Sequence, residues 1–105
     1  MVNAIKIQFP NDGNIYHIPL KAVAEIRAEM IAERDGIEIG SAEYFEELDI
    51  VYTDKRLALQ IVNNLDWQHL KELMVYADSN DDISDKDEWI PEALKEAEFI
   101  NSSIV

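Results

Sequence analysis

The chain has 105 residues, of which 48% are hydrophobic and 30% charged, as is typical of a globular domain with a buried core. Its 22 acidic and 9 basic residues give a formal net charge of -13, which disfavours direct binding to nucleic acid or to an anionic membrane surface. The absence of cysteine excludes disulfides, thiolate metal ligands and thiol nucleophiles. Because no long apolar run and no leader pattern is found, we expect a cytoplasmic protein.

The first predicted element is a β-hairpin. In residues 4–9 apolar side chains alternate with polar or small ones, which is the period of a strand with one buried face. Residues 10–14 are rich in turn formers, and residues 14–18 offer the return strand. A hairpin alone is only marginally stable, so we expect a very short third strand at residues 37–39, between two glycines.

The helical pattern predicts about four helices. The first runs from residue 19 to about residue 34, beginning with a proline and ending before a glycine. The longest pattern covers residues 41–62, and a capping residue at Asp54 leaves open whether it is one helix or two. Two further helices are predicted at residues 66–77 and 91–100.

These elements predict an α+β fold in one domain of residues 1–105, with a small antiparallel sheet packed against the helices. We expect the C-terminal tail, residues 101–105, to fray. Because the edges of so small a sheet must be covered, charged or paired, we expect a homodimer formed through an edge strand or an exposed helix face. The alternative is that the first helix or the tail covers the edge within one chain.

The strongest functional signal is the acidity of the last third of the chain. Nine acidic residues and two lysines lie between residues 78 and 98, and we expect the loop and the last helix to present one negative ridge to a basic protein partner. The predicted partner-binding residues are Asp78, Asp81, Asp82, Asp85, Asp87, Glu88, Glu92 and Glu96. The alternative is that the acidity serves solubility alone.

Divalent cation binding by the acidic loop 78–88 is a second alternative, because the loop begins like a calcium site. Oxygen ligands at its first, third and fifth places would come from Asp78, Asn80 and Asp82. The loop then departs from that pattern, with Ile83 in place of the glycine and Trp89 in place of the closing glutamate. These three residues are therefore only weak metal candidates.

The sequence contains no recognisable catalytic constellation. It has no glycine-rich phosphate loop, and none of its serines lies in a nucleophile-elbow context. His17 is expected on a strand and His69 on a helix, and neither has a second ligand at metal spacing on the same element. We therefore expect neither enzymatic activity nor a cofactor.

Trp67 and Trp89 flank the acidic loop, and we expect them to pack in the core, although one of them standing out as an interface anchor is the alternative. In being small, acidic and free of cysteine, the chain is similar in composition to several unrelated phage and bacterial inhibitor proteins that imitate the charge of nucleic acid. The resemblance implies an inhibitor or adaptor that occupies a nucleic-acid-binding groove, and it transfers no site residues.

Overall fold

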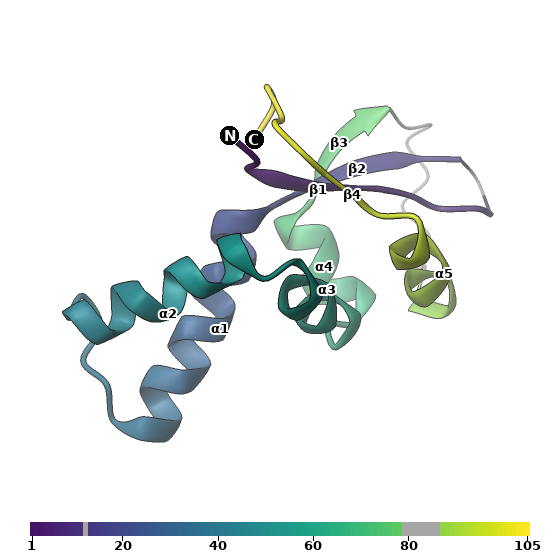
Figure 1. Cartoon of the computed structure of the whole chain (residues 1–105). Coiled ribbons are helices and arrows are strands. Elements are labelled where there is room, and N and C mark those ends of the chain that lie inside the picture. The colour runs from purple at the N-terminus through teal and green to yellow at the C-terminus, as the bar shows by residue number, and fades with distance from the viewer. Residues whose placement is uncertain (12, 79–86) are drawn as a thin grey trace.

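A computed structural model of the protein describes residues 1–11, 13–78 and 87–105. The protein has an α+β fold. Its antiparallel sheet has the strand order β3-β2-β1-β4, and the helices lie on one side of it, with both chain termini near its other side (Figure 1). The strands are β1 (Ala4–Gln8), β2 (Ile15–Pro19), β3 (Val75–Asp78) and β4 (Glu98–Ile100). The helices are α1 (Leu20–Asp35), α2 (Ala42–Thr53), α3 (Lys55–Asn63), α4 (Trp67–Leu73), the 3-10 helix η1 (Asp87–Trp89) and α5 (Ile90–Lys95). In the described part of the chain, no helix combines the length and the apolar character needed to cross a membrane.

The predicted hairpin is confirmed as β1 and β2. Ile5 stands opposite Ile18 in the antiparallel register, so that the apolar sides of both strands face the helices. The backbone N–H of Phe9 donates to the carbonyl oxygen of Asn14 at 3.0 Å, and that of Gly13 donates to Phe9 at 2.8 Å. Gly13 has a φ of 75°, a conformation that costs glycine little.

The third strand predicted at residues 37–39 is wrong. Gly36, with a φ of 71°, caps the C-terminus of α1, and the N–H of Ile37 donates to the carbonyl oxygen of Ala32 at 3.0 Å. This is the usual geometry of a helix end, and it turns the chain towards α2. Ile39 is 67% exposed, so the apolar pattern of this segment does not report a buried strand.

The long helical pattern at residues 41–62 forms two helices. Asp54 adopts an extended conformation (φ -120°, ψ 92°) and is at once the C-cap of α2 and the N-cap of α3. Its carboxylate accepts a hydrogen bond from the N–H of Leu57 at 3.1 Å. The break lets α2 pack along α1 while α3 runs beneath the sheet (Figure 1).

The last two predicted helices are shorter than expected. The helix α4 ends at Leu73 rather than near residue 77, because the chain then pairs with β2 as strand β3. The helix α5 ends at Lys95 rather than near residue 100, because residues 98–100 pair with β1 as strand β4. The two edge strands of the sheet therefore come from segments that the helical pattern predicts to be the C-terminal ends of helices.

The main core lies between the sheet and the helices α3, α4 and α5. Trp67 is at its centre with 1% of its surface exposed, and its ring meets those of Phe9 and Tyr16 edge to face, with centroids 5.7 and 6.1 Å away. Such arrangements are favourable beyond the burial of area. Trp89 is half-buried against the same core. The expectation that the tryptophans pack in the core is met fully by Trp67 and partly by Trp89.

The helices α1 and α2 form an antiparallel pair that extends away from the sheet, and we call residues 20–53 the helical arm (Figure 1). Its own small core contains Ala28, Ala32 and Tyr44. The two alanine side chains are small enough for α2 to lie close to α1. An ion pair between Arg27 and Glu47, 2.7 Å between Nη1 and Oε2, joins the helices beside this core.

The tail at residues 101–105 is anchored at Ser102, so the expectation that it frays is wrong for this residue. Ser102 is 7% exposed, and its N–H donates to Oδ1 of Asn3 at 2.7 Å while Nδ2 of Asn3 donates to its carbonyl oxygen at 3.0 Å. Its Oγ lies 2.7 Å from Nδ1 of His17 and accepts a hydrogen bond from the N–H of Ile104 at 3.2 Å. The tail is thereby held against β2.

Candidate functional site

Only part of the predicted partner-binding site falls within the described residues. The partner-binding candidates outside them are Asp81, Asp82 and Asp85, and the metal candidate Asn80 lies outside them as well. Asp78 is placed by its main chain as the last residue of β3. The candidates that are described throughout are Asp87, Glu88, Glu92 and Glu96. Partner binding by the loop therefore stays a prediction, as does calcium binding.

Asp87 has a structural contact. Its Oδ1 accepts a hydrogen bond from the N–H of Trp67, the first residue of α4. The first N–H groups of a helix have no partner within the helix, and a carboxylate there is favoured. Asp87 therefore ties η1 to the start of α4, and its charge is already engaged.

The helical part of the predicted negative ridge is shorter than expected, and the ridge of loop and helix together stays a prediction, because residues 79–86 lie outside the described residues. The helix α5 ends at Lys95, so Glu96 is its C-cap and Glu98 lies on the edge strand β4. Glu92 forms an ion pair with Lys95, 3.0 Å between Oε1 and Nζ. Glu88 and Glu96 are exposed. The acidic residues of the described segment 87–98 thus lie on η1, α5 and β4 rather than along one helix.

The helical arm carries a second concentration of acidic residues, which the predicted site did not include. Residues 20–53 contain nine acidic residues and three basic ones. Seven of the acidic side chains are exposed, namely Glu29, Glu33, Asp35, Glu38, Glu43, Glu46 and Asp49. A signal was present in the sequence, because Glu25, Glu29 and Glu33 recur every four residues and so share one side of a helix.

Glu25 of α1 and Tyr52 of α2 lie on the same side of the arm. The pKa of Tyr52 is raised, first by partial burial of the phenol and then by the nearby carboxylates of Glu25 and Asp49. Both effects disfavour the phenolate. Since Glu25 belongs to the other helix, its effect on Tyr52 indicates that these two side chains lie on adjoining sides of α1 and α2.

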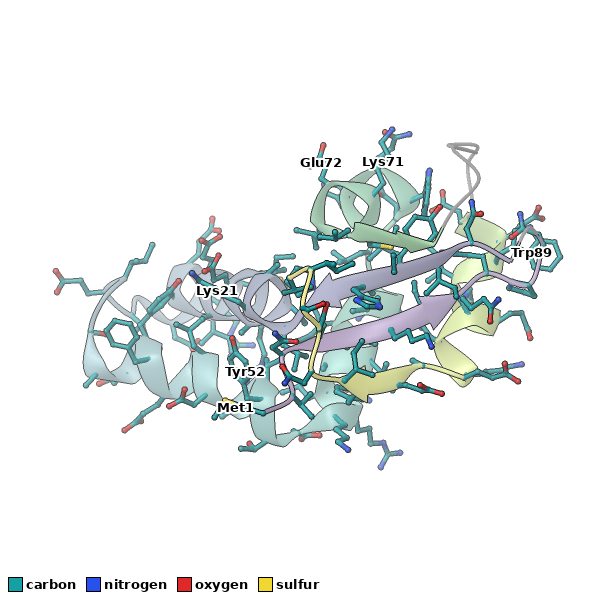
Figure 2. All side chains as sticks on the ribbon, turned by 90° about the horizontal axis from the view of Figure 1, so that it is seen from above. Met1, Lys21, Tyr52, Lys71, Glu72 and Trp89 are labelled. Carbon is teal, nitrogen blue, oxygen red and sulfur yellow. The ribbon has the colours of Figure 1, made fainter. Side chains whose placement is uncertain are left out.

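We call this side of the arm the acidic-aromatic face. It consists of Glu25, Glu29 and Glu33 from α1 and of Phe45, Asp49 and Tyr52 from α2. The side chains of Phe45 and Tyr52 are 55% and 42% exposed. A hollow lined by Met1, Val2, Asp49 and Tyr52 adjoins it. Figure 2 shows Tyr52 beside Met1 where the arm meets the sheet.

Two of the three basic residues of the arm lie away from this face. Arg27 and Arg34 line a groove between α1 and α3 together with Leu57 and Ile61. Arg27 is two positions after Glu25, which turns its side chain about 200° around the helix. The acidic-aromatic face has carboxylates from both helices, whereas the guanidinium groups of these two arginines pair with carboxylates outside it, Arg27 with Glu47 and Arg34 with Asp35.

Among the described residues, His17 contacts Ser102 and His69 contacts Asp66. The hydroxyl of Ser102 beside His17 is nearly buried and serves the tail, whereas a nucleophilic serine must reach its substrate. His69 contacts Asp66, 2.7 Å between Nδ1 and Oδ1, at the exposed start of α4. Within residues 1–11, 13–78 and 87–105, no group of three or more potential ligands is placed to hold a metal ion.

Comparisons with protein-family models, with curated proteins and with solved structures found no match for this chain. Any functional conclusion therefore depends on the chemistry of its own surface. The best-defined surface in the described residues is the acidic-aromatic face of the arm.

Proposed function

We propose that the protein is a non-enzymatic interaction protein whose acidic surface docks on a basic protein partner. The observation that supports this proposal is the exposed acidity of the helical arm, which extends away from the sheet and has seven exposed carboxylates. A net charge of about 2 to 8 in magnitude is ample for the solubility of a small domain, and a charge of -13 exceeds it. The excess charge suits recognition of a basic surface.

The carboxylates of the arm are arranged in a row that a nucleic-acid-binding groove could bind. Glu25, Glu29 and Glu33 follow one another along α1 at intervals of four residues, or about 6 Å. A protein that binds a phosphate backbone uses clustered lysine and arginine, which such a row of carboxylates would attract. An inhibitor or adaptor that occupies such a groove is the form of this function that we favour.

The acidic loop belongs to the same proposal. Asp81, Asp82 and Asp85 precede Glu88 of η1 in the sequence and would add negative charge to this part of the chain. The alternative in which the acidity serves only solubility predicts no specific partner.

The test is affinity capture from a lysate of the source cell at about 0.1 M and about 1 M salt, where screening lengths are about 10 Å and about 3 Å. Two variants accompany the wild type. The loop variant has Asp81, Asp82 and Asp85 changed to Asn, and leaves Asp87 in place because of its contact with Trp67. The arm variant is Glu29→Gln with Glu33→Gln.

We expect captured proteins with an excess of lysine and arginine, released at the higher salt concentration and captured less by at least one variant. If the captured proteins are neutral or acidic, or if capture is the same at both salt concentrations and with both variants, the proposal is wrong and solubility explains the charge.

A further inference from the structure

The acidic-aromatic face has the composition of an interface rather than that of an ordinary solvated helix surface. Phe45 and Tyr52 are 55% and 42% exposed and lie on the same side of α2. They are seven residues apart, which is two helical turns or about 10 Å along the axis. Exposed aromatic side chains with a polar rim are typical of the residues that contribute most to protein binding.

The carboxylates around the two rings indicate that a protein bound to this face would present positively charged side chains. The carboxylates of Glu25 and Asp49 are close enough to Tyr52 to raise the pKa of its phenol. Glu29 continues the row of carboxylates on α1, about one helical turn beyond Glu25. A cation placed between a ring and a carboxylate gains from both, and the chain itself contains a cation over a ring, with Nζ of Lys55 5.3 Å from the ring centroid of Phe99.

We propose that this face binds an arginine-rich α-helix of the partner, with arginine side chains over Phe45 and Tyr52 and their guanidinium groups paired with the surrounding carboxylates. The inference rests on the proposed function and names its surface and the chemistry of its partner. Arginine fits better than lysine because its planar guanidinium both stacks on a ring and pairs with a carboxylate through two hydrogen bonds.

A helical partner follows from the spacing of the anchors. Two side chains seven residues apart on a partner helix are also about 10 Å apart and point in the same direction, so they match Phe45 and Tyr52. The hollow lined by Met1, Val2, Asp49 and Tyr52 lies at one end of the face and suits an apolar side chain of the same helix. The site thus prefers a basic amphipathic helix to an unstructured basic peptide.

The probe is a dye-labelled helical peptide with two arginines seven residues apart and apolar neighbours, titrated with the full chain by fluorescence anisotropy. Phe45→Ala and Tyr52→Ala should each weaken binding about tenfold or more, as expected for central anchors. The control is Met30→Ala, since Met30 is 65% exposed on the same arm but lines the groove towards α3. This variant should bind within about twofold of the wild type.

The charge test compares two variants of equal net charge. Glu29→Gln with Glu33→Gln removes carboxylates from the face, and Glu43→Gln with Glu46→Gln removes two from the remaining surface of α2. We expect about a fivefold loss for the first pair and about a twofold loss for the second. Thermal melts of both variants show whether the arm is still folded. A lysine version of the peptide should bind more weakly than the arginine version.

The outcomes separate this inference from the function on which it rests. If the aromatic variants bind like the wild type, or if the two charge variants lose affinity equally, the face is not the site, although the chain still binds basic partners. If a scrambled peptide of the same composition binds as well as the helical one, the partner is not a helix and the inference is wrong. If none of the basic peptides binds at about 0.1 M salt, and lysate capture yields no basic partner, the proposed function fails as well.

Discussion

Nδ1 of His17 and Oγ of Ser102 lie 2.7 Å apart, and this contact joins strand β2 to the tail that follows β4. Ser102 also exchanges two hydrogen bonds with Asn3, so one nearly buried residue connects both ends of the chain. Figure 1 shows the two termini close together at this point. Removal of this nearly buried hydrogen-bonding group should therefore lower the stability of the whole fold and not only the order of the tail.

Ser102→Ala should lower the free energy of unfolding by about 1 kcal/mol, because it removes the hydroxyl that contacts both His17 and the N–H of Ile104. Urea titration measures the loss, and hydrogen exchange of the Ile104 amide should become faster. The control is Ser103→Ala, an exposed neighbour that should leave both values unchanged. Equal behaviour of the two variants would show that the tail is not held by Ser102.

The unfolding free energy should fall as the pH falls below 6.5, because of His17. Burial of the imidazole, and then the charge of Lys6 on the neighbouring strand, hold the pKa of His17 below its ordinary value of 6.5. Between the ordinary pKa of histidine in the unfolded chain and the lowered pKa of His17 in the folded chain, the unfolded chain takes up a proton that the folded chain does not. The free energy of unfolding therefore falls as the pH falls through this window. The loss ends once the pH reaches the folded pKa.

An NMR titration of the His17 ring tests this cause directly. Lys6→Gln removes the neighbouring positive charge and should raise the pKa of His17 towards 6.5, which narrows the window. A pKa that does not move, or that falls, in this variant would show that Lys6 does not act on the imidazole.

Asp54→Ala should destabilise the junction between α2 and α3. The variant removes the side chain that accepts a hydrogen bond from Leu57 at the start of α3, and loss of such a cap costs about 1 kcal/mol. Chemical denaturation measures it. Glu46→Ala, exposed in the middle of α2, serves as the control and should change the unfolding free energy by less than about 0.5 kcal/mol. A cost no larger than that of the control would remove Asp54 as the cause of the break.

The features that the sequence predicts well are those set by near neighbours along the chain. The hairpin turn, the proline and glycine at the ends of α1 and the caps of the later helices all depend on residues within about four positions. Ser41 and Asp66, the first residues of two predicted helical stretches, each accept a hydrogen bond from an N–H three residues later. Even the break at Asp54 was visible as a capping residue inside a helical pattern.

The strands β3 and β4 were missed for a physical reason. Glu98 on β4 pairs with Lys6 on β1, and a pairing across so much of the chain has no local period. Each of these strands is so short that its few apolar residues also fit a helix. The acidic-aromatic face was missed likewise, because it exists only once α1 and α2 pack side by side and bring Glu25 to Tyr52.

Ala28→Leu should open the helical arm. Ala28 is 1% exposed between α1 and α2, and a larger side chain there forces the helices apart at a cost of about 1 to 3 kcal/mol. Peptide affinity should fall with it, since the acidic-aromatic face needs both helices. Glu29→Leu, one position further on the exposed surface, is the stability control. If Ala28→Leu unfolds at the same denaturant concentration as the wild type, the arm is not packed as described.

The predicted homodimer could form at the edge strands β3 and β4. The tail is held at Ser102, but the outer edges of β3 and β4 are the ends of the sheet. If two copies pair through an edge, light scattering at micromolar concentration should give twice the mass of the 12.1 kDa chain. A single 12.1 kDa species would remove the dimer and leave the docking proposal intact.

Docking of the acidic surface on a basic partner is tested most directly by the association rate constant of the protein with its captured partner as a function of salt. Attraction between an acidic surface and a basic one acts mainly on the association rate, and it weakens as salt shortens the screening length. We expect a rate constant that falls at least about tenfold between about 0.1 M and about 1 M salt, and a smaller fall for Glu29→Gln with Glu33→Gln. A rate constant that is independent of salt would contradict it.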